Sequence, residues 1–272
     1  MARRLFCEIS PLCYQISYAK CCAQRRFKDA VSGSRFAVQK SAVPLPELVS
    51  RHASLIRRRL GNQRMDLQEN KAVNLGLASP HIHGLLIRPG ETFSLWRCVG
   101  SVTARKGYRV GLTITKNSPA EGVGGGMCQL SNLLHWMALH SELTVCERHH
   151  HDRFDLFPDY KRQVPFGTGT SILYNYLDYR LYNGTARTYQ LLLYVEGEYL
   201  RGELRATQAE PVRFHIHTEN ERFVQEADGV YRVGQVYRDR VDKRTGDLLE
   251  HTLLQENHAK VMYDTAGLAV CD

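Results

Sequence analysis

The stretch Gly122-Val-Gly-Gly-Gly-Met-Cys-Gln-Leu-Ser131 decides how the rest of the chain is interpreted. Glycine adopts backbone angles closed to other residues and lets another group approach closely, so these glycines predict a tight loop. The apolar residues after the loop recur at helical spacing, which places Cys128 in the first turn of a predicted helix. Unpaired N–H groups and the positive end of the helix dipole at that position favour a thiolate.

The predicted helix has one apolar face. Its apolar residues stand at intervals of three and four: Leu130, Leu133, Leu134, Met137 and Ala138. This spacing is typical of an amphipathic helix that packs into a core. Because the apolar face must be buried, we expect the helix to hold Cys128 in a fixed position.

The two sides of this helix have different patterns. Upstream, residues 46–60 and 68–87 each carry apolar residues on one helical face, and residues 107–116 alternate like a strand. Downstream of residue 164, alternating runs and turn signals predict strands, including a hairpin around Glu196-Gly197-Glu198. A β-α-β rhythm is absent after residue 145, which argues against a doubly wound fold.

The predicted class is α+β. We expect a helical N-terminal half, in which the Cys-bearing helix packs on an antiparallel β-sheet, and a β-rich C-terminal end. The chain has 272 residues, of which 43% are hydrophobic, enough for one large domain or two small ones. We predict three segments: a basic, partly ordered N-terminal arm (1–44), a core domain (45–207), and a small β-rich extension packed on the core (208–272).

The net charge is +8, and the basic excess is concentrated before residue 60. The basic arm is expected either to make weak contact with an anionic surface or to be a solvated face. Because none of the familiar nucleic-acid-binding motifs is present, no nucleic-acid partner is predicted.

Cysteine usage and hydropathy indicate the compartment. The eight cysteines do not have the spacing of a small disulfide framework, which suggests a reducing environment. No stretch approaches the roughly 20 apolar residues of a membrane span, and the N-terminus makes a poor secretory signal. The sequence alone therefore predicts a cytoplasmic chain without a transmembrane segment.

A second cluster, Cys146-Glu-Arg-His-His-His-Asp152, follows the predicted helix and one short strand. A chain that turns back along the helix can bring this cluster near Cys128. A cysteine nucleophile needs a base to form the thiolate and an acid to protonate the leaving group, and one histidine does both. A carboxylate would orient that histidine, with Asp152, Asp155 and Asp178 as open candidates. The glycine loop and the Cys128 amide would supply oxyanion donors.

The same motifs allow two other interpretations, a metal site and a nucleotide-binding loop. A zinc site built from Cys128, Cys146 and the histidines is an open alternative, but no Cys-x-x-Cys or His-Glu-x-x-His pair occurs, so no metal is predicted. The glycine loop lacks the Lys-Ser/Thr ending of a phosphate-binding loop, so nucleotide binding is not expected. No cofactor is predicted.

These motifs resemble those of the VanW family, named for the accessory protein of B-type vancomycin-resistance clusters. The resemblance covers roughly residues 45–265 and rests first on the glycine–cysteine stretch and on Glu147-Arg148-His149 with His151. Further matching motifs are Gln68-Glu69-Asn70-Lys71, Pro89-Gly90-Glu91-Thr92-Phe93-Ser94, Leu177-Asp178 with Asn183-Gly184-Thr185, and Asp242-Lys243-Arg244-Thr245-Gly246.

The resemblance implies work on the bacterial cell wall and a link to antibiotic resistance. Domains of this family in some clostridial proteins are understood to act as L,D-transpeptidases, in which a cysteine attacks a peptide stem and passes the acyl group to an amine. Carried over, Cys128 is the nucleophile, His149 or His151 the base, and Asp178 a candidate orienting residue. We expect the peptidoglycan peptide or precursor to contact Gly124, Gly125, Gly126, Gln129, Ser131 and Arg148.

Two departures from the family pattern bear on this function. Many members have an aspartate where this chain has Gly169; if that aspartate orients the histidine in them, Asp178 or Asp152 must replace it here, or activity is weakened. Secreted members carry a signal or membrane anchor, so family activity would require an extracytoplasmic location. Two functions stay open: a cysteine acyl-transfer enzyme acting on peptide stems, or a non-catalytic accessory protein of a vancomycin-resistance system that binds cell-wall precursor.

Overall fold

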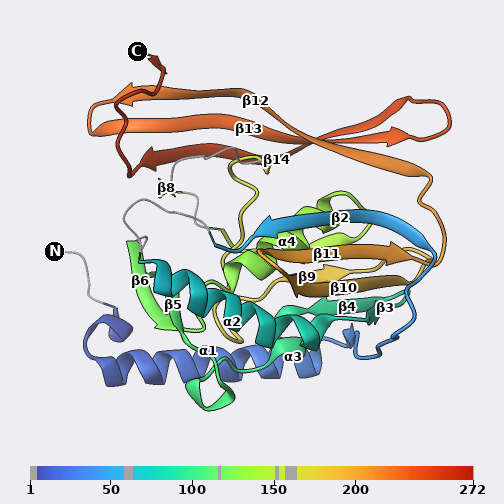
Figure 1. The fold of residues 1–272 in the computed structure, drawn as a ribbon, viewed down its shortest axis with the longest axis horizontal. Helices are drawn as coiled ribbons and strands as arrows, with labels where there is room; N and C mark the ends of the chain where they lie inside the picture. Colours follow the sequence, from blue (N-terminus) through green and yellow to red (C-terminus); the bar gives the residue numbers. More distant parts are fainter. Residues whose placement is uncertain (1–4, 58–63, 116–117, 151–152, 157–163, 272) are drawn as a thin grey trace.

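The computed structural model describes residues 5–57, 64–115, 118–150, 153–156 and 164–271, and it has an α+β fold with a β-rich C-terminal end (Figure 1). The helices of this part are η1 (Phe6–Glu8), α1 (Pro11–Val31), α2 (Met65–Ile82), α3 (Leu95–Val99), η2 (Ala104–Lys106) and α4 (Cys128–Leu139). The strands are β1 (Arg35–Phe36), β2 (Glu47–Leu55), β3 (Leu85–Ile87), β4 (Glu91–Ser94), β5 (Val110–Thr115), β6 (Ser118–Val123), β7 (Thr144–Glu147), β8 (Phe154–Asp155), β9 (Arg180–Tyr182), β10 (Tyr189–Glu196), β11 (Tyr199–Ala206), β12 (Val212–Glu226), β13 (Gly229–Asp242), β14 (Leu248–Val261) and β15 (Val270–Cys271). The predicted class is therefore confirmed.

The strands form three sheets and a hairpin. The central sheet has the order β2-β11-β10-β3 and is antiparallel throughout, and a second sheet has the order β1-β4-β9-β7. Strands β5 and β6 form the hairpin that leads into the glycine loop. The C-terminal sheet has the order β15-β12-β13-β14-β8. The hairpin predicted around Glu196-Gly197-Glu198 is confirmed as β10 and β11.

The core lies between the helices and the central sheet. Helix α4 packs against β2 and β11, and α2 packs against β10. The predicted apolar stripe of α4 is buried in this core, with Leu130, Leu133, Leu134, Met137 and Ala138 each at most 1% exposed. The stripe therefore fixes the rotation of α4 and, with it, the direction in which Cys128 points.

The helix predicted over residues 46–60 is wrong. Most of this segment is β2, which pairs antiparallel with β11 along its whole length. The hydroxyl of Ser50 donates to the carbonyl oxygen of Met137 at 3.0 Å, which ties the strand to α4. The local pattern suited a helix, but pairing with a strand far along the chain decided the outcome, since tertiary context overrides a weak local preference.

The sequence of the N-terminal segment suits a short helix and a loosely ordered basic arm, but the structure has a long helix there. Helix α1 has 21 residues, and the side chain of Ser10 accepts a hydrogen bond from the Cys13 amide at its start. The Tyr18 hydroxyl donates to the carbonyl oxygen of Tyr174 at 2.8 Å, so α1 is docked on the core. No helix among the described residues combines the length and apolar character that a bilayer crossing requires.

The long strands β12, β13 and β14 form a separate layer beyond β2 and α4 (Figure 1). Hydrogen bonds join this layer to the core: Arg238 Nε donates to the carbonyl oxygen of Leu139 at 2.8 Å, and Asn257 Nδ2 donates to that of Phe166 at 3.0 Å. The exact boundaries 1–44, 45–207 and 208–272 stay a prediction.

The close approach of the glycine loop to β5 gives a test of this packing. A Cβ added to Gly125 would lie 2.0 Å from the carbonyl carbon of Gly111, and backbone on both sides cannot move aside. We expect Gly125→Ala to lower the free energy of unfolding by about 3 kcal/mol or more, measured by urea denaturation.

Gly76→Ala is the matched control, because Gly76 lies on the exposed side of α2 with nothing within 4 Å of an added Cβ. It should raise stability by about 0.5–1 kcal/mol through helix propensity. Equal effects of the two substitutions would contradict the close approach.

Candidate functional site

The glycine loop turns the chain from β6 into α4. Gly124 and Gly126 have φ of 78° and 88°, in the left-handed region that favours glycine. The amides of Gly124, Gly125 and Gly126 donate to the carbonyl oxygens of Arg109, Gly122 and Leu112 at 2.8, 3.0 and 2.8 Å. The loop amides are therefore engaged within the fold, and the loop's role is to place the start of α4.

Cys128 is the first residue of α4, and its side chain is half-buried. Burial raises the pKa of the thiol, while hydrogen bonding from the backbone N–H groups of Ile172 and of Cys128 itself acts in the opposite direction. Burial prevails over the helix start, so the resting form is the thiol rather than the thiolate that the sequence pattern favoured.

The polar face of α4 binds the segment 167–172. Ser131 Oγ and Thr170 Oγ1 lie 2.5 Å apart, and Asn132 Oδ1 accepts hydrogen bonds from the Thr170 amide at 2.7 Å and hydroxyl at 2.8 Å. His135 Nδ1 lies 3.1 Å from the hydroxyl of Tyr179. Burial, followed by the positive charges of Arg148, His150 and Arg238, lowers the pKa of His135 to about 3.

Two predicted substrate-binding residues on α4 make contacts within the fold. Gln129 Nε2 donates to Ser54 Oγ at 2.8 Å and to the carbonyl oxygen of Leu55 at 2.9 Å, which ties the helix start to β2. Ser131 is fully buried. In this conformation both side chains support the position of Cys128.

At the end of β7, Glu147 accepts several hydrogen bonds. His149 Nε2 lies 2.9 Å from Glu147 Oε1, and because a carboxylate can only accept, Nε2 is the donor and the lone pair of a neutral ring sits on Nδ1. Arg25 of α1 binds both carboxylate oxygens at 2.5 and 2.6 Å. Burial raises the pKa of Glu147, but the bonds from Arg25, His149 and the Asp178 amide outweigh it and lower the pKa.

Glu147 thus makes the carboxylate contact with His149 for which the sequence offered only aspartates. Asp178 is fully buried and accepts hydrogen bonds from Ser94 Oγ at 2.5 Å, Arg180 Nε at 2.8 Å, the Tyr179 amide at 2.9 Å and the Trp96 amide at 3.1 Å. Asp178 therefore joins β4 and α3 to β9. Asp155 interacts with Arg232 at 3.3 Å and with Tyr263 at 2.9 Å, which ties β8 to the C-terminal sheet. His151 and Asp152 lie outside the described residues.

Cys128 and His149 flank one short segment. The Ser171 amide donates to the carbonyl oxygen of His149 at 2.7 Å, and the next amide, that of Ile172, is directed at the Cys128 sulfur. Within the described part of the chain, no histidine side chain makes a hydrogen bond to the Cys128 thiol. The fold therefore brings the two motifs to the same segment without joining thiol and imidazole.

Gly169 packs directly against His150. A Cβ at this position would lie 2.9 Å from Cε1 and 3.2 Å from Nδ1 of the His150 ring. The aspartate that the family resemblance leads one to expect at this position would meet that ring. In this chain the His150 ring occupies the space that a side chain at position 169 would need, and glycine leaves that space free.

A cavity of ≈ 650 Å³ lies between α4 with β7 on one side and β13 with β14 on the other. Its lining includes His135, Cys146, Arg148, Arg238 and Arg240. Arg148 Nε also donates to the carbonyl oxygen of Gly169 at 3.1 Å, so this residue reaches both the cavity and the segment beside Cys128. The sequence did not predict the parts played by His135 or Arg25, which belong to no motif, and it gave no role to Glu147 although that residue stands in the Glu147-Arg148-His149 motif.

Comparisons with known proteins support the resemblance. The family model described as "VanW like protein" matches residues 70–205. The chain is 36% identical over 199 residues to the Vancomycin B-type resistance protein VanW of Enterococcus faecalis, covering 73% of this chain and 72% of that protein.

A second relative is the Uncharacterized protein YoaR of Bacillus subtilis, 31% identical over 115 residues, which is 42% of this chain and 36% of that protein. No solved structure is significantly similar. The matched region contains the glycine loop, Cys128, Glu147 and β9. On this evidence, the chain belongs to the VanW family.

Proposed function

We propose that this chain is a cysteine acyl-transfer enzyme that acts on the peptide stems of peptidoglycan. The observation that carries the proposal is the placement of Cys128 as the first residue of α4, with its own backbone N–H and that of Ile172 directed at the sulfur. Backbone N–H groups directed at a cysteine sulfur stabilise its thiolate, the form that attacks a carbonyl carbon. The substrate class comes from the family resemblance and from the resistance named in the Enterococcus relative.

The reaction has two steps. The Cys128 thiol loses its proton to a histidine, and the sulfur attacks the carbonyl carbon of a stem amide bond. The C–N bond breaks, the leaving amine takes the proton from the histidine, and the acyl group remains on sulfur as a thioester. An amine of a second stem then attacks the thioester, the C–S bond breaks, and its proton returns to the sulfur through the same histidine.

His149 is the base that the described residues support best. Its Nε2 donates to Glu147, which leaves Nδ1 as the proton acceptor, and its side chain is 36% exposed and therefore accessible. His135 is buried, and its pKa of about 3 makes it a poor proton acceptor at neutral pH. Activity requires the substrate-bound enzyme to bring His149 and Cys128 together, as catalytic contacts often tighten only in the complex.

The cavity between α4 and the C-terminal sheet is the proposed binding site for the stem. The lining of this cavity contains three arginines and two glutamates: Arg148, Arg238, Arg240, Glu142 and Glu250. Together these side chains carry one net positive charge. A peptide stem carries carboxylates that this surplus attracts. Arg148 connects the cavity to the segment that flanks Cys128.

The second candidate function is non-catalytic binding of a cell-wall precursor, as an accessory protein of a resistance system. The raised pKa of the Cys128 thiol favours it, because a nucleophilic cysteine ordinarily has a lowered pKa. Binding without turnover would need only the cavity and the fold. The two functions differ in whether a thioester forms.

Mass spectrometry of the protein mixed with a synthetic peptide stem separates them. We expect the wild type to carry an acyl adduct on Cys128, and Cys128→Ala to lose both the adduct and at least about 1,000-fold of the turnover. Cys271→Ala, which removes an exposed thiol in β15, is the control and should leave both unchanged. Stem binding that survives Cys128→Ala, with no adduct and no turnover in the wild type, would establish the binding protein instead.

The role of Glu147 can be tested apart from its structural contacts. We expect Glu147→Gln to lower kcat/KM by about 10²–10⁴-fold, because the carboxylate that holds His149 in its tautomer is gone. Both Glu147→Gln and the control Arg25→Gln break the ion pair between Arg25 and Glu147. Arg25→Gln keeps the contact between Glu147 and His149, so it should lower stability and retain most activity. Equal losses of activity in both variants would make Glu147 a structural residue only.

His135 predicts a pH dependence of stability. Its pKa falls from 6.5 in the unfolded chain to about 3 in the folded protein, so the folded state binds fewer protons between these values. The stability contributed by neutral His135 is present above pH 6.5 and is lost as the pH falls toward 3.

Between pH 7 and pH 5 we expect the wild type to lose about 2 kcal/mol more than His135→Gln, measured by urea unfolding. Ring resonances of His135 that stay neutral at pH 5 would support the same shift. An identical loss in both proteins would show that His135 titrates normally.

A further inference from the structure

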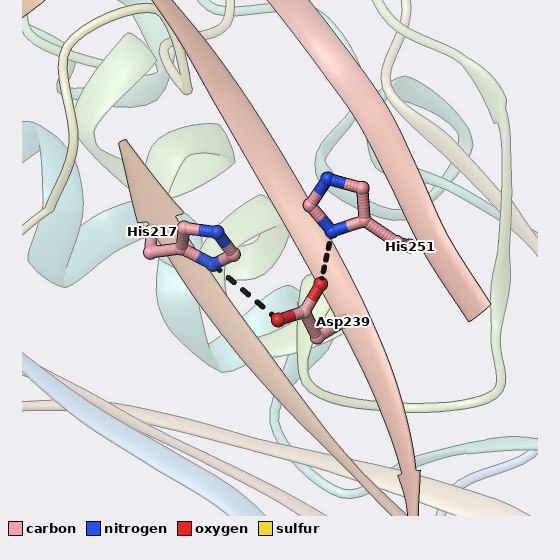
Figure 2. A group of neighbouring side chains, drawn as sticks. All are labelled: His217, Asp239 and His251. Carbon is pink, nitrogen blue, oxygen red and sulfur yellow. Dashed lines mark hydrogen bonds and ion pairs between the residues drawn. The ribbon is translucent and has the colours of Figure 1, made fainter. Parts of the chain in front are cut away.

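The outer face of the C-terminal sheet carries a group of metal-ligating side chains remote from the cysteine site. His217 lies on β12, Asp239 on the central strand β13, and His251 on β14 (Figure 2). One ligand atom from each lies within 4.8 Å of the others. The neighbouring Arg238 and Arg240 of β13 point the other way, to Leu139 and Glu142 of the core. Successive side chains alternate across a sheet, so Asp239 faces outward.

Both imidazoles present the same atom to one carboxylate. His251 Nδ1 lies 2.6 Å from Asp239 Oδ1, and His217 Nδ1 lies 3.7 Å from Asp239 Oδ2 (Figure 2). The other nitrogen of His217, Nε2, lies 3.2 Å from Glu219 Oε1. Because a carboxylate only accepts, Nε2 carries the hydrogen, and Nδ1 of the neutral ring turns its lone pair toward Asp239. The same rule makes His251 Nδ1 a donor to Asp239, so a bound ion takes the place of that proton and joins both imidazoles to the carboxylate.

The contact of His217 with Glu219 is the arrangement that metal-ligating histidines use. Such a histidine donates its second N–H to a carboxylate, which fixes the tautomer and makes the first nitrogen a better ligand. Two imidazoles and one carboxylate form a donor set that Zn²⁺ takes readily, with solvent in the fourth position. His217 and His251 are 37% and 43% exposed at their side chains, so solvent can reach that position.

The ring planes are held in place before any ion binds. The Tyr237 ring stacks on His251 with centroids 4.3 Å apart and an interplanar angle of 13°, and on His217 at 6.0 Å and 24°. Register shifts between β13 and β14 lie on both sides of the run that contains Asp239, leaving Leu249 and Leu254 as extra residues of β14. Bulges of this kind re-aim side chains and occur often beside functional sites.

We propose that His217, Asp239 and His251 form a zinc site on the outer face of the C-terminal sheet. Each strand of the β12-β13-β14 layer contributes one ligand, so the ion joins all three strands. The ligand atoms lie within 4.8 Å of one another, and zinc would bind them at roughly 2.0–2.2 Å. The site stands independently of any reaction at Cys128.

The test is to titrate chelator-treated protein with Zn²⁺ and measure the binding heat by calorimetry. A second titration uses Co²⁺ and measures the absorption spectrum. Eight cysteines compete for these ions, and thiolate ligands give intense sulfur-to-cobalt bands that a site of nitrogen and oxygen ligands lacks. We expect one equivalent of each ion to bind, with the weak bands of a nitrogen–oxygen site. His217→Ala, His251→Ala and Asp239→Asn should each weaken binding at least about tenfold.

His258→Ala is the matched control, because this residue is on β14, stacks on Tyr231 and pairs with Glu226 outside the group. It should bind as tightly as the wild type. Zinc should also raise the melting temperature of the wild type and of His258→Ala, and not that of the three ligand variants. The proposal would be overturned by any of three results. These are a lack of stoichiometric binding, the appearance of sulfur-to-cobalt bands, and an affinity of His251→Ala equal to that of the wild type.

Discussion

A single buried guanidinium, that of Arg180, holds the candidate site together. Its Nε lies 2.8 Å from Asp178 and 3.5 Å from Glu147, and its two terminal nitrogens each bind Asp29 of α1 at 2.7 Å. Burial alone would lower the pKa of Arg180, but hydrogen bonds with Asp29 and Asp178 raise it. Removing one partner from such a network leaves buried charge uncompensated, at a cost of about 3–5 kcal/mol. The position of His149 depends on this network through Glu147.

The parts of the fold that the sequence predicted well are those governed by local pattern. The α4 stripe from Leu130 to Ala138 has the period of a buried helix face, and the β10–β11 hairpin has a turn at its centre. Residues 46–60 had a helical pattern as well, yet Glu47–Leu55 within them form β2 because β11 offers a partner edge. The length of α1 was also missed, since its docking rests on residues such as Tyr174, far along the chain. Long-range pairing leaves little trace in local periodicity.

The site was predictable to the level of its two motifs and no further. The glycine loop and Cys128 stand where a helix begins, as their order in the sequence indicated. The contact between Glu147 and His149 was missed, because a residue two positions before a histidine has no fixed geometry until its strand is placed. The group of His217, Asp239 and His251 has no motif spacing either, since hairpin lengths and bulges set which residues meet. In each case side chains meet through tertiary structure alone.

The docking of α1 has a consequence for the order in which the protein folds. Arg25, Asp29 and Tyr18 bind Glu147, Arg180 and Tyr174, partners that lie 122, 151 and 156 residues further along the chain. Helix α1 leaves the ribosome long before these partners exist, and contacts between such distant residues form slowly. The Arg25–Glu147 clamp can close only after β7 has been synthesised, and the Asp29–Arg180 clamp only after β9. The ionic environment of His149 is therefore incomplete until β9 has been synthesised and has met α1, the first long helix of the chain.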